Sequence, residues 1–283
     1  MRTILAMIWG IFTIVLPLRA GAQVLYGSNP KAGHYVPVNG IRLYYEVYGK
    51  GHPLLLLHGN GGSILSMRYQ IPALAKHFEV IAVDSRAQGM STDTNSPLTF
   101  TLMASDMAGL LDSLHIDGAY VVGWSDGGII GLKLALDYPR KVAKLVADGA
   151  NFVADSTALP ESMLDEMAAT SFSKLSKAAQ ANIRKHSFFP QRAGMIFDQL
   201  NELDLKHPNF TLEQLHSIQA PTLVMAGDHD LIKLQHTIKL FRNLPHAQLC
   251  IVPGAHHNLL QARHNLANRI IIDFLERPFV DMK

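Results

Sequence analysis

The 283-residue sequence contains a single cysteine, Cys250. One thiol excludes an intramolecular disulfide, a zinc site built from several cysteines and a CxxC redox pair. The 14 histidines are scattered without H-E-x-x-H or a comparable spacing, so we expect neither a metal site nor a cofactor. Lys and Arg total 25 against 23 for Asp and Glu. This excess is too small for a nucleic-acid-binding surface, and nucleic acid is not an expected partner.

The sequence also lacks an uncharged apolar run of the roughly 20 residues that a membrane-spanning helix needs. The run at residues 4–18 is shorter, follows a basic start at Arg2 and precedes the small residues A-G-A at 20–22. This order is typical of a secretory signal peptide. We predict that residues 1–22 are removed on export and that the mature chain is periplasmic or secreted, without a stable membrane anchor. An uncleaved anchor is the alternative.

After this leader, short apolar runs alternate with amphipathic helical patterns, which favours an α/β fold. Asn39-Gly40 joins two extended segments, 34–38 and 41–48, and predicts a tight hairpin turn. Further buried strands are expected at 54–57, 80–83, 119–122, 145–147, 222–225 and 249–252, and helices at 64–76, 100–114, 127–138, 231–243 and 258–275. The sequence therefore predicts a mostly parallel, twisted sheet of about eight strands with helices on both faces.

One stretch, residues 151–216, has helical patterns but no strand-like run. It divides the predicted core into a first part, 23–150, and a second part, 217–283. Because an insertion on a rigid α/β scaffold usually covers a pocket, we predict that this segment forms a helical lid. The alternative is that its helices only cover the surface.

The strongest local motif is G-W-S-D-G-G at residues 123–128, which follows an apolar strand and opens a helix. G-x-S-x-G in a strand-turn-helix setting is typical of a nucleophile elbow. The serine occupies a strained turn, and glycines two residues before and after it avoid collisions with the neighbouring backbone. We predict that Ser125 is a catalytic nucleophile and that the backbone N–H of Asp126 donates to an oxyanion.

A serine hydroxyl is a poor nucleophile unless a base and an orienting acid assist it, and in this setting they follow in the order acid, then histidine. Two later loops supply candidates after strand-like runs. G-D-H-D at 227–230 offers two aspartates, and P-G-A-H-H at 253–257 offers two histidines. Asp148, at the end of an earlier strand, is a further candidate acid. Loops at the carboxyl ends of strands are where α/β sheets place their sites.

Over residues 35–275 the chain resembles the α/β-hydrolase superfamily. The resemblance implies the α/β-hydrolase fold, with Asp230 rather than Asp228 as the acid and His257 rather than His256 as the base. Some members use the position of Asp148 instead, so that assignment stays open.

Two more segments carry this resemblance. H-G-N-G-G at 58–62 is similar to the family's oxyanion loop, which implies that the backbone N–H of Asn60 is the second oxyanion donor. D-S-R-A-Q-G-M-S at 84–91 resembles a stretch that is structural in the family, and we assign it no catalytic role.

A closer resemblance within the superfamily is carried by 123–128, G-A-N at 149–151 and H-N-L at 257–259, which are similar to valacyclovir hydrolases, the biphenyl-hydrolase-like proteins. In that group the aspartate after the nucleophile recognises the α-amino group of amino-acid esters. The resemblance implies that Asp126, together with Trp124, binds substrate. The other interpretation is that Asp126 only favours the N-terminus of its helix electrostatically.

We therefore predict an exported serine hydrolase that cleaves carboxylic esters of small molecules through an acyl-enzyme, with α-amino-acid esters as a candidate class. An acyltransferase or a carbon–carbon bond hydrolase would use the same three residues. A non-catalytic ligand-binding protein is the alternative from another class. The sequence does not predict an oligomeric state.

Overall fold

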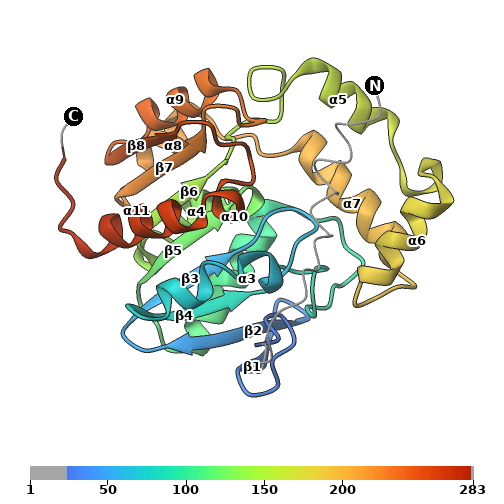
Figure 1. The fold of residues 1–283 in the computed structure, drawn as a ribbon, viewed down its shortest axis with the longest axis horizontal. Coiled ribbons are helices and arrows are strands. Elements are labelled where there is room, and N and C mark those ends of the chain that lie inside the picture. The colour runs from blue at the N-terminus through green and yellow to red at the C-terminus, as the bar shows by residue number, and fades with distance from the viewer. Residues whose placement is uncertain (1–23, 282–283) are drawn as a thin grey trace.

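The computed structural model describes residues 24–281, so the predicted signal peptide lies outside the described residues. One eight-stranded sheet runs through the molecule in the order β1-β2-β4-β3-β5-β6-β7-β8 (Figure 1). β1 and β2 pair antiparallel, as do β2 and β4, and the remaining pairs are parallel. The strands are β1 (Gly33–Val38), β2 (Ile41–Gly49), β3 (His52–Leu57), β4 (Phe78–Val83), β5 (Ala119–Trp124), β6 (Val142–Asp148), β7 (Thr222–Gly227) and β8 (Ala247–Val252).

Helices cover both faces of this sheet. On one face α3, α4, α8 and α9 enclose one apolar core, and on the other η1, α2, α10 and α11 enclose a second. The helical segments are η1 (Ile64–Met67), α2 (Ile71–Leu74), α3 (Phe100–Ser113), α4 (Asp126–Asp137), η2 (Pro139–Lys141), α5 (Glu161–Ala169), η3 (Phe172–Lys174), α6 (Lys177–His186), α7 (Ala193–Lys206), α8 (Leu212–Ser217), α9 (Leu234–Asn243), α10 (Leu259–Ala262) and α11 (His264–Glu276).

Strand β3 shows why the central strands read as continuous apolar runs. Its four leucines, 54 to 57, are all fully buried. Side chains alternate across a strand, so Leu55 and Leu57 enter one core while Leu54 and Leu56 enter the other. With a core on each face, this part of β3 is apolar at every position and shows no polar alternation.

The predicted fold class is confirmed: the hairpin and all six further strands are present, with helices on both faces. Two predicted helices are divided instead of continuous. The segment 64–76 forms η1 and α2, because Pro72 has no N–H to continue a helix and instead lies in the first turn of α2. The segment 258–275 breaks at Arg263, whose φ of −120° is not helical.

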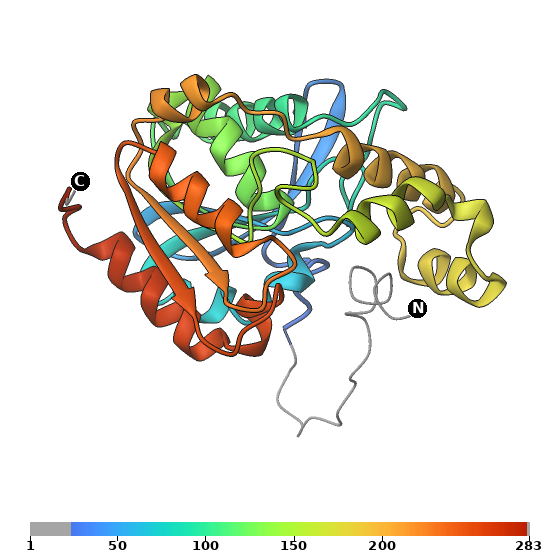
Figure 2. The ribbon, with the colours of Figure 1, turned by 90° about the horizontal axis from the view of Figure 1, so that it is seen from above.

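Between β6 and β7 the chain forms α5, η3, α6, α7 and α8 without joining the sheet. Figure 2 shows α5, α6 and α7 grouped beside the sheet, on the side away from α11. α8 differs from them in packing against α4 and α9, and its Leu215 enters the same apolar core as Ile196, Leu200 and Leu203 of α7. Among the described helices, none is both long and apolar enough to cross a membrane.

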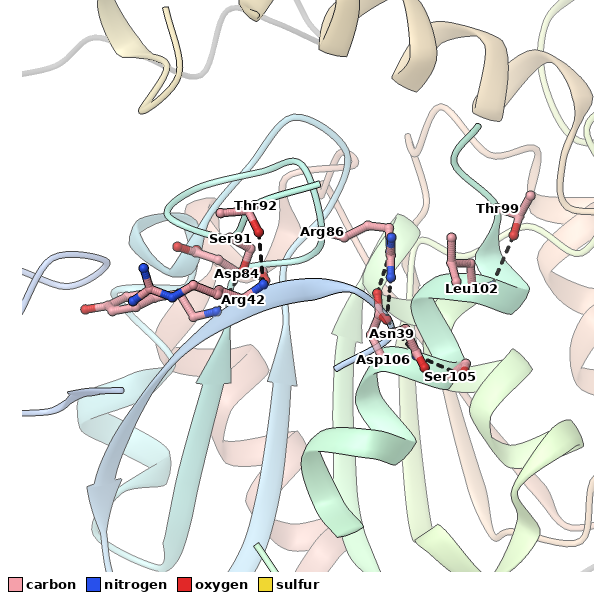
Figure 3. Close-up of polar contacts among 11 residues, drawn as sticks. Asn39, Arg42, Asp84, Arg86, Ser91, Thr92, Thr99, Leu102, Ser105 and Asp106 are labelled. Carbon is pink, nitrogen blue, oxygen red and sulfur yellow. Dashed lines mark hydrogen bonds and ion pairs between the residues drawn. The ribbon is translucent and has the colours of Figure 1, made fainter. Parts of the chain in front are cut away.

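The loop after β4 is fixed by a buried ion pair (Figure 3). The guanidinium of Arg86 donates from Nε and Nη2 to the carboxylate of Asp106 on α3, at 2.6 Å each. Both side chains are at most 1% exposed, and Asn39 in the hairpin turn donates to the same carboxylate at 2.9 Å. Three segments distant in sequence are thereby joined, in keeping with the structural role expected of residues 84–91.

Candidate active site

Ser125 lies at a strained turn between β5 and α4. Its backbone has φ 55° and ψ −120°, a conformation that few residues other than glycine adopt. The flanking glycines are required by close approach: a Cβ on Gly123 would lie 2.1 Å from the carbonyl oxygen of Gly127, and one on Gly127 would lie 2.4 Å from that of Leu57. The turn therefore holds Ser125 at the carboxyl-terminal end of β5, a central strand of the sheet.

A chain of hydrogen bonds runs from this serine. The Ser125 Oγ is 3.0 Å from Nε2 of His257, and Nδ1 of the same ring is 2.8 Å from Oδ1 of Asp230. An ionised carboxylate only accepts, so Nδ1 carries the proton and Nε2 is free to accept from the hydroxyl. The structure thus brings together Ser125, His257 and Asp230, which follow β5, β8 and β7.

The two candidate acids differ electrostatically. Burial raises the pKa of Asp230, but the charge of His257, the hydrogen bond to it and backbone hydrogen bonds together outweigh this effect and lower the pKa below its usual value. Burial, followed by the charge of Asp230, raises the pKa of Asp148 well above its usual range. The carboxyl oxygens of Asp148 have no hydrogen-bond partner among the described residues. Only Asp230 combines an ionised carboxylate with contact to the imidazole.

The neighbouring candidates lie in other places. Asp228 accepts a hydrogen bond from the backbone N–H of Ala255 at 3.2 Å and so fixes its own loop. His256 is exposed, and its Nδ1 lies 3.1 Å from the carbonyl oxygen of His229. Neither side chain contacts Ser125 in the structure.

The histidine loop is positioned by its neighbours. The indole N–H of Trp124 donates to the backbone carbonyl of His257 at 2.7 Å, so this side chain both lines the pocket and holds the loop. A Cβ on Gly149 would lie 2.9 Å from two ring atoms of His257, and its φ of 61° also favours glycine. Only glycine leaves room for the ring there.

The loop 58–62 lies against the elbow. A Cβ on Gly59 would lie 3.0 Å from the Cβ of Ser125, which shows how closely the two backbones approach. His58 is buried and burial lowers its pKa to about 4, so the ring is neutral. It donates from Nδ1 to the carbonyl of Gly59 at 2.7 Å and accepts at Nε2 from the N–H of Ser85 at 3.1 Å, which fixes the loop.

A pocket opens at Ser125 between the core and the helices of residues 151–216. Its far wall is apolar and comes from the predicted lid and from the loop after β7. Its described lining consists of Gly59, Asn60, Trp124, Ser125, Asp126, Asn151, Leu159, Met163, Met167, Asp204, His207, Leu231, Ile232 and His257.

Two carboxyl groups meet in this pocket. Asp126, at the N-terminus of α4, lies within hydrogen-bonding reach of the Asp204 carboxyl and the Asn60 amide. Asn60 donates from Nδ2 to Asp204 at 2.9 Å. Burial raises the pKa of Asp126 to about 7, and the contacts with Asn60 and Asp204 offset part of that effect. Burial and the charge of Asp126 raise the pKa of Asp204 well above its usual value.

Among the polar pocket residues that sequence reasoning missed, which include His207, Asp204 is the one that contacts Asp126. It lies on α7, whose pattern predicts an amphipathic helix but not the direction in which its polar face points. The one available signal was an acidic residue within the segment expected to cover the pocket. No group of three or more His, Cys, Asp or Glu side chains in residues 24–281 is arranged to hold a metal ion.

A family model described as alpha/beta hydrolase fold matches residues 52–206, and the chain belongs to this family of enzymes. Within the family it is similar to serine hydrolase BPHL. The human protein is 28% identical over 267 residues, covering 91% of both chains, and the mouse protein is 30% identical over 254 residues, covering 85% of both. The family membership predicted from the motifs is confirmed.

Two further similarities are more limited. Over 103 residues, 36% of this chain and 39% of the relative, the chain is 45% identical to the putative carbamate hydrolase RutD of Azorhizobium caulinodans. The solved structure of a meta-cleavage product hydrolase from Pseudomonas fluorescens superposes with a TM-score of 0.69 at 22% identity, covering 87% of this chain and 98% of that one. At that identity the likeness concerns the fold alone.

Proposed function

We propose that the chain is a serine hydrolase of small-molecule carboxylic esters that works through an acyl-enzyme on Ser125. One observation carries the proposal: a single imidazole, that of His257, links the Ser125 hydroxyl at 3.0 Å to the Asp230 carboxylate at 2.8 Å. Distances of about 2.6 to 3.2 Å are those over which a general base takes a proton.

In the proposed reaction, Ser125 Oγ attacks the ester carbonyl while His257 Nε2 takes the hydroxyl proton. Asp230 keeps the ring oriented and stabilises the imidazolium. His257 then returns the proton to the departing alkoxide, so the alcohol leaves and the acyl group remains on the serine. Water, activated by the same histidine, attacks the acyl-enzyme and releases the acid.

The oxyanion formed in each step needs hydrogen-bond donors. We assign the backbone N–H groups of Asn60 and Asp126 to this role, because their loops meet beside Ser125 and because Asp126 begins helix α4. N–H groups in the first turn of a helix have no partner within the helix. Loss of one such donor costs on the order of 3 kcal/mol of transition-state stabilisation.

Within this class, α-amino-acid esters are the favoured substrates. The support is that Asp126 lines the pocket beside Ser125, so its side chain is available to a bound ammonium as well as to its own helix. Carbamates are the second candidate, supported by the similarity to RutD over 103 residues. Paired aryl esters and aryl carbamates of one phenol would rank the two classes.

The test is turnover of short-chain and α-amino-acid aryl esters by the wild type and by Ser125→Ala. We expect the variant to lose at least about four orders of magnitude in kcat. Labelling of the wild type, but not the variant, by a fluorophosphonate would exclude a non-catalytic binding protein. Equal turnover by both proteins would end the proposal, and product analysis with an added alcohol would separate hydrolysis from acyl transfer.

We also propose export, on the leader pattern of residues 1–22 alone. The check is the N-terminal sequence of the protein expressed in a Gram-negative host and recovered from the periplasm or the medium. A mature chain that begins at Gln23 would support export. A cytoplasmic chain that still begins at Met1 would refute it.

A further inference from the structure

The carboxyl pair of Asp126 and Asp204 lacks a cation. Of the described residues that line its pocket, none is a lysine or an arginine. Among residues 24–281, the only donor that contacts both carboxyls is the side-chain amide of Asn60. Asp126 is only 5% exposed, and its Oδ2 has no hydrogen-bond partner among the described residues. A buried carboxylate in such a state needs either a proton or a positive partner.

Attachment of the lid to the core does not explain why the two carboxyls lie together. The N-terminal half of α7 is already joined to the core, because Arg192, which precedes the helix, forms an ion pair with Asp93 and Gln199 donates to the carbonyl of Ser96 at 3.3 Å. Two carboxyls attract each other only while they share a proton. An ion pair such as Arg192–Asp93 holds a helix without a shared proton. Attachment of α7 to the core therefore does not account for the two carboxyls at the pocket.

We propose that Asp204, carried by the lid helix α7, is a specificity-determining residue that forms with Asp126 a two-carboxylate site for a primary ammonium group of the substrate. Each carboxylate accepts one N–H, so the site favours a primary ammonium over a quaternary one, which has no N–H to donate. This inference rests on the proposed function, since it places the ammonium beside the ester carbonyl that Ser125 attacks.

The site also predicts a proton balance. Without ligand, the two carboxyls hold about one proton between them near neutral pH, because burial raises the pKa of each and the charge of Asp126 raises that of Asp204 further. When the ammonium binds, both carboxyls ionise and that proton goes to the buffer. The other titratable groups lining the pocket are His257, on the loop after β8, and His207, at the end of α7. Comparing charged with neutral ligands cancels their contribution.

The binding test uses the Ser125→Ala background, in which no turnover occurs, and isothermal titration at pH 6.5 to 7 in two buffers of different ionisation enthalpy. The probes are L-alaninamide, its neutral analogue lactamide and the trimethylammonium compound betaine amide. We expect alaninamide to bind at least about 10-fold more tightly than either control and to release close to one proton. Equal binding of the three probes, or binding without proton release, would overturn the proposal.

The substitution test places Asp204→Asn in the same background. This variant should bind alaninamide about 10-fold more weakly and release less than the parent's proton, because only Asp126 still titrates, while lactamide binding is unchanged. Glu202→Gln is the matched control, because Glu202 lies on the same helix but its side chain is 62% exposed and pairs with Lys206. It should behave as the parent. Undiminished alaninamide binding by Asp204→Asn would show that Asp204 does not contribute to the ammonium site.

Turnover separates this inference from the proposed function. In the active enzyme, Asp204→Asn should raise KM for an alanyl aryl ester about 10-fold and leave kcat/KM for the propionyl ester within about 2-fold. If both esters are hydrolysed in a Ser125-dependent way but their ratio does not change, the inference fails and the hydrolase stands. If neither ester is hydrolysed, the proposed function fails, while the binding result still decides the ammonium site.

Discussion

Two buried carboxylate sites in this molecule have opposite electrostatic arrangements. Asp106 lies under the loop 84–91 with both oxygens bonded to the guanidinium of Arg86 (Figure 3). Asp126 lies beside Ser125 with another carboxyl, that of Asp204, as its neighbour and with one oxygen unpartnered among the described residues. The first carboxylate is neutralised within the fold. The second is not, although burial disfavours the charged form of both carboxyls.

The difference distinguishes groups that stabilise the fold from groups that are available to a ligand. Removing one partner of a buried ion pair leaves an uncompensated charge and destabilises the protein. Neutralising a carboxyl that the fold leaves without a cation should do the reverse, because active sites retain groups at a cost to stability. The following substitutions test this distinction at the pocket, at the ion pair and between them.

The largest effect is expected at the pocket, for Asp230→Asn. The amide can donate to Nδ1 of His257 and so stabilise the wrong tautomer, and kcat should fall by about 10⁴-fold. The oxygen of Asp230 that faces His257 also accepts from the N–H of Ile232, so an amide turned to donate to the ring loses that bond, and the thermal midpoint should fall only by the equivalent of about 1 kcal/mol. Steady-state kinetics and thermal unfolding provide the two readings. Asp148→Asn is the control for the rival acid, and a larger loss of kcat in that variant would reassign the acid.

At the ion pair, Asp106→Asn should act on stability. It leaves the Arg86 guanidinium buried without a counter-charge, and we expect a loss of about 3 to 5 kcal/mol in the free energy of unfolding. Denaturant titration measures that loss. Turnover per folded molecule should remain near the parental value at low temperature. A variant that loses activity while keeping its stability would contradict the division between the two sites.

Gly149→Ala tests a backbone position that lies directly against the ring of His257. The added methyl would meet the ring of His257 at 2.9 Å and displace it. Because displacement of a catalytic group by about 1 Å can cost 10²-fold in rate, we expect kcat to fall by about that factor. Gly254→Ala is a suitable control: it also has positive φ, but its added Cβ would meet nothing within 4 Å. Similar kinetics for the two variants would show that the ring does not need this space.

The smallest effect is expected for Asp126→Asn, which should stabilise the folded protein instead of destabilising it. The folded-state pKa of Asp126 is raised to about 7, so its charged form opposes folding, and the resulting cost grows as pH rises from about 4 to 7. Asp126→Asn removes that cost and should stabilise the protein by about 1 kcal/mol or more at pH 8, with no gain near pH 4. Thermal unfolding across this range measures the difference. A pH-independent change would mean that the carboxyl does not titrate in this window.

The elbow and the sheet could be predicted because their constraints are local. Gly123 is dictated by a backbone contact within the strand-turn-helix unit, Gly127 meets the end of β3 but belongs to the same short motif, and the buried strands are marked by uninterrupted apolar runs. The register of the acid and histidine loops could not be derived from spacing. Asp228 and Asp230 are both reasonable acids until the structure shows which one faces the imidazole, and the family resemblance had supplied the choice.

Asp204 could not be predicted for a physical reason. Its meeting with Asp126 depends on how α7 lies over the core, which is decided by packing between residues far apart in the chain. The helical pattern gives an amphipathic face and no direction in space. The same limit applies to α8, which belongs to the predicted lid segment in sequence but packs with the core through Leu215.

The indole that holds the histidine loop also makes the site observable. The chain has two tryptophans: Trp9, within the predicted leader, and Trp124. The Trp124 ring is 7% exposed and its centroid lies 5.8 Å from that of His257. In a chain without residues 1–22 all tryptophan fluorescence would therefore arise beside the imidazole of His257. Protonation of that ring, acylation of Ser125 and ligand entry should each change the emission, so the reaction can be followed by stopped-flow fluorescence without a label.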